Sequence, residues 1–159
     1  NLKAIRQAIR AKKLKAKISV VISDTHKKLA DYQVDYICLT GWKKIIPDFL
    51  IEKYPQRILN IHPGLIPDEL TGKVINPDGT EALWNRGKYM DQAIKNFLNK
   101  KATYAGSTVH FLSKEFDFGT VLGRCFEKII PGDTVESLYQ RLKVKENQIY
   151  VQALIKLCQ

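Results

Sequence analysis

RILNIHPGLIP, residues 57–67, joins a hydrophobic run to two polar side chains, and this stretch decides how the chain is expected to fold. The run predicts a buried strand over residues 57–62, which Pro63 ends. Side chains two positions apart on a strand point to the same face, so Asn60 and His62 are expected to emerge together. An amide and an imidazole on one face at the end of a strand raise the prospect of a ligand site.

Helices and strands alternate on both sides of this stretch. Apolar runs predict strands over residues 18–23, 36–41, 107–113 and 120–130. Helical spacing predicts helices opening at Asn1, over residues 47–53 and 88–100, and from Asp133 into the last 25 residues, while residues 66–86 read as a loop. The pattern is typical of an α/β protein with an open, mostly parallel twisted sheet and helices on both faces.

Composition narrows the class of protein. A chain of 159 residues with 45% hydrophobic content matches one globular domain. No apolar run approaches the roughly 18 residues that cross a bilayer, so we expect no membrane association and a cytoplasmic location. Three well-separated cysteines, Cys38, Cys125 and Cys158, predict reduced thiols with neither a zinc site nor a disulfide, and no metal is expected.

The formal net charge of +10 favours anionic partners without choosing among metabolites, polycarboxylates and nucleic acid. Part of the excess lies in the run Lys12, Lys13, Lys15 and Lys17, which is read as a solvated face. Few aromatic residues accompany these lysines, so the stacking surface of a single-strand binder is missing and nucleic-acid binding is not favoured.

In open α/β sheets, ligands bind outside the carboxyl ends of the strands. That rule selects the segments TGWKKII after residue 39, NIHPGLIP after residue 59, and KEFDFG after residue 113. An Asn, a His and a carboxylate that converge there could stabilise an oxyanion and move a proton. The alternative is structural: Asn60 caps a turn, His62 is a core residue and Asp117 belongs to a turn.

The motifs LTGW, ILNIHPGLIP, GSTVHF, EFDFGTV and DTVESLYQRL occur in an order that resembles the folate-dependent formyltransferases. Within that group, the chain resembles the glycinamide ribonucleotide formyltransferases of purine biosynthesis, because a proline follows the histidine. The resemblance implies a Rossmann-like formyltransferase fold and transfer of a formyl group from 10-formyltetrahydrofolate to the amine of glycinamide ribonucleotide. It implies one domain over residues 1–159.

The resemblance also implies catalytic roles. Asn60 would donate to the formyl oxygen, and His62 would act beside it as a proton donor or a second oxyanion stabiliser. Asp117 would pair with His62 and help carry the proton from the amine to the folate nitrogen. His110 matches a position near the same centre and is a candidate supporting residue, with a purely structural role as the alternative.

Binding residues follow from the same resemblance. Folate would be held by Lys44, Ile45, Ile46, Leu112 and Phe116, and glycinamide ribonucleotide by Asn1, Gly41, Pro63 and Glu146. Lys44 stands where the family usually has arginine. Many relatives have two glycines after the aspartate, and this chain has Phe118 in place of the first. The family's first strand and phosphate loop would precede Asn1, so the domain is expected to be incomplete there and between about residues 24 and 35.

Other readings stay open. A formyltetrahydrofolate hydrolase or a tRNA-directed formyltransferase would use the same three residues, and an inactive binding or scaffold domain would keep only the fold. A homodimer is a further open alternative.

Overall fold

The computed structural model describes residues 1–21 and 33–159. Four helices and four strands are assigned within these ranges. The helices are α1 (Leu2–Arg10), α2 (Asp48–Lys53), α3 (Met90–Asn99) and α4 (Val135–Leu157). The strands are β1 (Ile37–Cys38), β2 (Ile58–His62), β3 (Tyr104–Phe111) and β4 (Val121–Lys128).

These strands form one open sheet in the order β1-β2-β3-β4. Only β1 and β2 run parallel, because β2 pairs antiparallel with β3 and β3 pairs antiparallel with β4. The open α/β architecture is confirmed, whereas the expected mostly parallel arrangement is wrong for the described strands. The nine residues between β3 and β4, 112–120, are too few for a crossover helix, so the two strands form an antiparallel pair.

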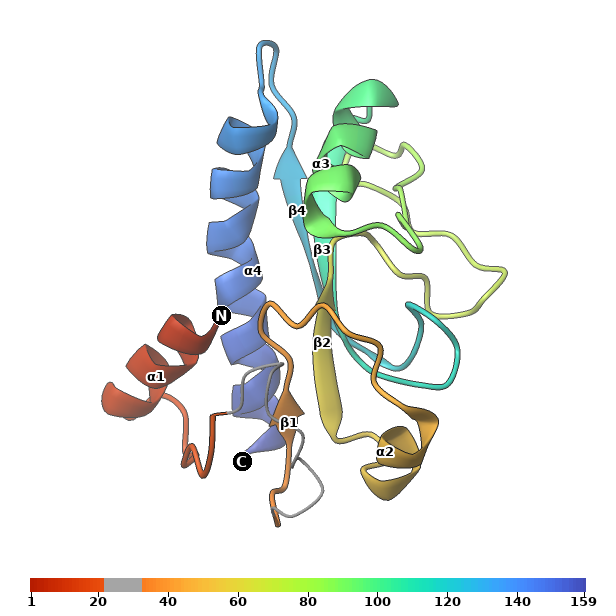
Figure 1. Ribbon diagram of the computed structural model, residues 1–159. Coiled ribbons are helices and arrows are strands. Elements are labelled where there is room, and N and C mark those ends of the chain that lie inside the picture. Colours follow the sequence, from red (N-terminus) through yellow and green to blue (C-terminus); the bar gives the residue numbers. More distant parts are fainter. Residues whose placement is uncertain (22–32) are drawn as a thin grey trace.

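One face of the sheet packs against α4, which runs along it in Figure 1 with α1 beside it. The side chains of Leu59, Val109 and Phe111 meet Tyr150 and Leu154 of α4 in a common apolar cluster. Helix α1 joins this cluster through its buried stripe, because its apolar residues recur at helical spacing.

The opposite face carries α2 and the loops that follow β2 and β3. Ile37 of β1 and Ile58 of β2 are paired in register and form a second cluster with Ile46 and Leu50, here called the α2 cluster. Since α4 and α2 lie on opposite faces, helices on both faces are confirmed. Strand β2 therefore directs Leu59 toward α4 and Asn60 toward the loop-covered face.

Two local predictions are corrected. Residues 18–21 lie in no strand, while residues 22–23 fall outside the described ranges. In the described sheet β1 pairs only with β2, so no strand supplies the backbone hydrogen bonds that would make residues 18–21 a strand. The final helix begins after Thr134, one residue beyond the predicted Asp133, because Thr134 and Ser137 form a reciprocal capping box.

Asp133 instead binds Arg141, with 2.7 Å between its Oδ2 and the guanidinium Nη2. This hydrogen bond holds the pKa of the carboxyl well below its usual range. The described cysteines are all unpaired, with Cys125 buried and the other two half-buried. No helix within the described ranges has the length and hydrophobicity that a membrane span requires, and the predicted cytoplasmic location stays a prediction.

Phe97 provides a test of the packing between α3, the sheet and α4. Its side chain is fully buried in a cluster with Ile94, Leu138 and Leu142. We expect Phe97→Ala to lower the free energy of unfolding by about 3–5 kcal/mol, because it removes buried surface and leaves a cavity. Urea denaturation measures the change, and Phe49→Ala, whose side chain is 60% exposed, serves as the matched control. Equal losses in both variants would contradict this packing.

Candidate active site

Asn60, His62 and His110 lie on the loop-covered face of β2 and β3. Asn60 and His110 are partners in the strand register, and Asn60 Nδ2 lies 3.4 Å from His110 Nε2. The other ring nitrogen of His110, Nδ1, lies 3.0 Å from the carbonyl oxygen of Phe111. Because Nδ1 must donate to that carbonyl, Nε2 accepts from the amide, and the Asn60 oxygen points away from the ring. The amide is thereby oriented, and its second N–H stays available to a ligand.

His110 can accept from the Asn60 amide because its imidazole is uncharged near neutral pH. Burial and the neighbouring His62 lower its pKa to about 4 from an ordinary value of 6.5. A neutral imidazole keeps one acceptor nitrogen, which the Asn60 amide needs. His110 therefore holds the Asn60 amide through Nε2, and its supporting role at a catalytic centre stays a prediction.

His62 contacts Asp117, the third residue of the predicted trio. Its Nδ1 lies 3.5 Å from Asp117 Oδ1, and its Nε2 lies 2.7 Å from the main-chain oxygen of Trp84. Only 2% of His62 is exposed. Both ring nitrogens thus face oxygen atoms of the protein. The parts of the cluster that reach solvent are Asp117, whose side chain is 18% exposed, and the half-buried Asn60.

Asp117 adopts a left-handed backbone conformation with φ of +49°. Its carboxylate accepts a 2.7 Å hydrogen bond from the Gly87 amide. Burial alone would raise the pKa of Asp117, but the hydrogen bond and charge of His62, with the Gly87 amide, outweigh it and lower the pKa. The carboxylate is therefore ionised near neutral pH. The structure brings the predicted residues Asn60, His62 and Asp117 into one cluster.

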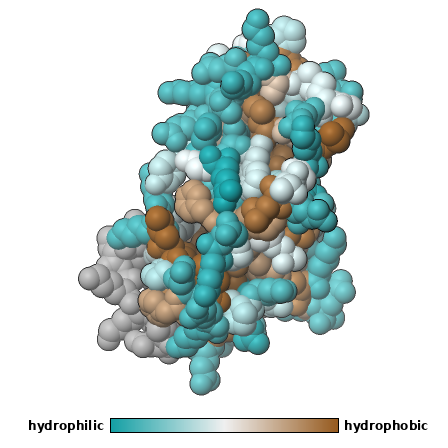
Figure 2. Space-filling view, turned by 90° about the vertical axis from the view of Figure 1, so that its right-hand side faces the viewer, coloured by the Kyte–Doolittle hydropathy of each residue, from teal (hydrophilic) through white to brown (hydrophobic). Residues whose placement is uncertain are grey.

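The residues predicted to hold folate divide into two groups. Ile46 is buried in the α2 cluster, and Leu112 packs against the same cluster. Ile45 and Phe116 are 80% and 54% exposed. Lys44, which precedes Ile45, is also exposed. Figure 2 shows hydrophobic side chains among hydrophilic ones on this side of the molecule.

The residues predicted to hold the second substrate are not gathered at one place. Gly41 follows β1 with φ of +73°, and Pro63 follows β2 with its carbonyl accepting from Asn85. Glu146 is fully buried on the α4 face, where Ser107 Oγ donates to Oε1 at 2.7 Å and Lys143 Nζ to Oε2 at 2.9 Å. Asn1 caps α1. The structure therefore separates Glu146 from the cluster of Asn60, His62 and Asp117.

Three residues of the cluster escaped the sequence reasoning: Trp84, Asn85 and Gly87. Trp84 and Gly87 contact His62 and Asp117 through main-chain atoms, and such contacts carry no side-chain signature. The one signal was Asn-Arg-Gly, residues 85–87, a turn-forming sequence at the end of the loop predicted over residues 66–86.

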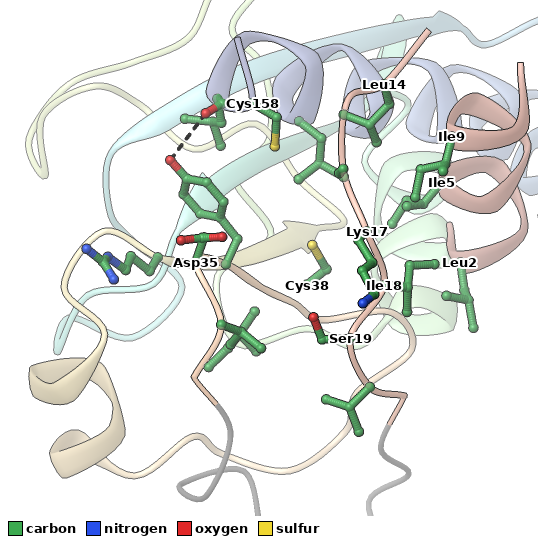
Figure 3. Close-up of a pocket in the computed structure, with 18 of the residues that line it drawn as sticks. Leu2, Ile5, Ile9, Leu14, Lys17, Ile18, Ser19, Asp35, Cys38 and Cys158 are labelled. Atoms are coloured by element: carbon green, nitrogen blue, oxygen red, sulfur yellow. Dashed lines mark hydrogen bonds between the residues drawn. The ribbon is translucent and has the colours of Figure 1, made fainter. Parts of the chain in front are cut away.

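No group of three or more metal-ligating side chains occurs in the part of the chain that the structure describes. A cavity of about 600 Å³ lies away from the cluster, between residues 14–21, β1 and the end of α4 (Figure 3). Leu14, Ile18, Cys38 and Cys158 are among its lining residues, and none of the predicted site residues is. The candidate active site lies elsewhere, where the loops after β2 and β3 meet His62.

Comparison with known proteins assigns the class. The model of the formyl transferase family matches residues 1–154. The chain therefore belongs to the formyl transferase family, in agreement with the resemblance that its motifs showed.

Within the family, the chain is similar to particular enzymes. The chain is 34% identical over 131 residues to the chloroplastic phosphoribosylglycinamide formyltransferase of Arabidopsis thaliana. That match covers 82% of this chain and 40% of the plant protein. The corresponding share of the Vigna unguiculata enzyme is 38%, so the chain spans less than half the length of these relatives.

Solved structures confirm the fold. Phosphoribosylglycinamide formyltransferase from Bacillus halodurans superposes with a TM-score of 0.77 at 22% identity, over 98% of this chain and 88% of that one. A formyltetrahydrofolate deformylase from Pseudomonas syringae reaches 0.72 at 14% identity, over 97% of this chain and 56% of that one. At these identities the two structures show a shared fold.

The neutral state of His110 predicts a pH dependence of stability. Its folded pKa of about 4 lies below the ordinary 6.5, so the unfolded chain binds the extra proton first as pH falls. Stability is therefore lost as pH falls from about 6.5 toward 4, by a total on the order of 3 kcal/mol. In His110→Gln, urea unfolding at pH 7 and pH 4.5 should show a smaller difference than in the parent protein. An unchanged difference would contradict a neutral buried His110.

Proposed function

We propose that this chain carries the formyl-transfer centre of a glycinamide ribonucleotide formyltransferase. The observation that carries the proposal is the contact between His62 and Asp117 beside the oriented amide of Asn60, in a chain of the formyl transferase family. The identity to the Arabidopsis enzyme supports the choice of glycinamide ribonucleotide as acceptor.

The roles of the three residues follow from their chemistry. Asn60 has one N–H directed to His110 and a second N–H free for a ligand, so the amide can donate to an oxygen that gains negative charge. The donor, 10-formyltetrahydrofolate, supplies an activated formyl group at a folate nitrogen. Asp117 is ionised and reaches solvent, so its carboxylate can accept a proton from the attacking amine directly or through water. His62 lies beside that carboxylate, with its Nδ1 3.5 Å from Asp117 Oδ1.

The proposed folate surface extends from the α2 cluster. Ile46 and Leu112 supply its buried wall, and Ile45 and Phe116 supply exposed apolar area that a flat heterocycle would cover. Lys44 supplies a cation for the carboxylates of the glutamyl tail. Since lysine has one charged nitrogen where arginine has a planar fork, this contact would be less directional than an arginine contact.

Recognition of the ribonucleotide is assigned to residues at two places, because Glu146 is buried on the α4 face, apart from the cluster of Asn60, His62 and Asp117. The Pro63 backbone and Gly41 follow the ends of β2 and β1, and Glu146 with Asn1 would meet the ribose and its neighbours. Both Glu146 oxygens already bind Ser107 and Lys143, so a ribose hydroxyl would have to share or replace one of these partners.

Turnover by full-length protein tests the proposal. With 10-formyl folate and glycinamide ribonucleotide, we expect release of the deformylated folate, followed by absorbance, to require the amine. Release without the amine would indicate a hydrolase, and no release in either case would indicate a binding or scaffold protein. Either result would overturn the proposed transfer.

Substitutions at the centre sharpen this test. We expect Asn60→Ala to lower kcat by about 10²–10³-fold, because an oxyanion donor is lost. Asp117→Asn should lower kcat by about 10²–10⁴-fold, because a proton acceptor is lost. Asn99→Ala and Asp91→Asn, both exposed on α3, are matched controls with expected parent-like activity. Full turnover in either centre variant would refute the assigned roles.

A further inference from the structure

Trp84 contacts His62 through its main-chain carbonyl. The distance from His62 Nε2 to the Trp84 oxygen is 2.7 Å, which is short for a neutral N–H···O hydrogen bond. Gly64 makes this approach possible, because a Cβ at that position would lie 1.7 Å from the same oxygen. The Trp84 carbonyl therefore covers one edge of the imidazole, and this edge is excluded from solvent.

The side chain of the same residue anchors Asp117. Trp84 Nε1 donates to the main-chain oxygen of Asp117 at 3.0 Å. Asp117 has φ of +49°, a conformation that non-glycine residues rarely adopt without support from their surroundings. Gly87, three residues after Trp84, binds the Asp117 carboxylate at 2.7 Å. Residues 84–87 thus hold both the backbone and the carboxylate of Asp117.

Further contacts fix the indole ring in place. The Arg86 guanidinium lies 5.1 Å above the Trp84 ring, and the Phe118 ring lies 5.9 Å from it. Arg86 also donates to the Phe116 carbonyl at 2.9 Å and pairs with Glu115 at 3.2 Å. The segment 84–87 is therefore bound to the segment 115–118 through Trp84, Arg86 and Gly87.

We propose that Trp84 is a positioning residue, which holds His62 by its carbonyl and Asp117 by its indole so that the two form one catalytic pair. This proposal rests on the proposed function of the same site. The direct contact between the imidazole and the carboxylate is 3.5 Å long, beyond the range of a good hydrogen bond. Because that contact is weak, the alignment of the pair depends on its anchors, and Trp84 is the residue that touches both members.

Trp84→Phe is the sharpest variant, because it keeps the main-chain carbonyl and an aromatic ring for Arg86 and Phe118 but removes the indole N–H. We expect kcat to fall about tenfold, the effect of one hydrogen bond at the reacting centre, with KM changed less than about twofold. With Asp117 less firmly held, its pKa should rise, and the acid limb of the kcat–pH profile should move to higher pH.

Tyr36→Phe is the matched control. It also removes one hydrogen-bond donor from an aromatic side chain, because the Tyr36 hydroxyl donates to the Leu157 carbonyl at 3.5 Å, and it lies away from the cluster of Asn60, His62 and Asp117. We expect this variant to keep the parent kcat and pH profile. If Trp84→Phe and Tyr36→Phe show the same kcat and the same profile, the positioning role is refuted.

A magnetic resonance readout separates this proposal from the proposed function. The ring nitrogen signals of His62 and the carboxyl carbon signal of Asp117, titrated with pH, should shift in Trp84→Phe and stay unchanged in Tyr36→Phe. This result is expected even if the protein shows no formyl transfer. Unchanged signals in Trp84→Phe would overturn the positioning role alone.

The parent protein offers a test that no folding defect can obscure. A scalar coupling across the hydrogen bond between His62 Nε2 and the Trp84 carbonyl carbon is expected, because the contact is short. Absence of this coupling, with the His62 signal itself observed, would overturn the proposal.

Discussion

The alternation of side chains along β2 is the constraint on which the rest of the structure depends. This strand lies between β1 and β3, and both of its faces are covered. Leu59 packs against α4 with no exposed surface, while Asn60 and His62 point to the loop-covered face. A register shift of one residue would turn the amide and imidazole into the apolar core and expose the leucine. The same packing that buries the core therefore fixes the face that carries the candidate site.

The fold was predictable where local pattern decides the structure. The strand at residues 57–62 and the helix at 88–100 agree with β2 and α3 within two residues at either end. The segment 18–21 has strand-forming residues, yet a strand exists only when a neighbouring backbone supplies hydrogen bonds, and no strand of the described sheet pairs with this segment. Strand direction was missed for a similar reason, because an apolar run does not encode it. Only the short link after β3 carried that information.

The candidate site was predictable to the extent that it is made of side chains. Asn60, His62 and Asp117 were found from motifs, and the structure brings them together. The atoms that hold them are largely main-chain groups, namely the carbonyl of Trp84 and the amide of Gly87. Any residue type offers those groups, so sequence cannot identify them. What sequence does record is the space they need, as the glycine at position 64 illustrates.

The order of side chains along β2 also gives the proposed reaction a direction. Ile58 belongs to the α2 cluster, and Asn60 and His62 follow it on the same face at steps of about 7 Å. A flat donor resting on that cluster would bring its formyl group to the Asn60 amide, with the carboxylate of Asp117 beyond it, next to His62. The acceptor amine would then approach from the exposed edge of Asp117, because the far side of His62 is closed by Trp84. Apolar binding, oxyanion stabilisation and proton transfer would thus follow one another along a single strand face.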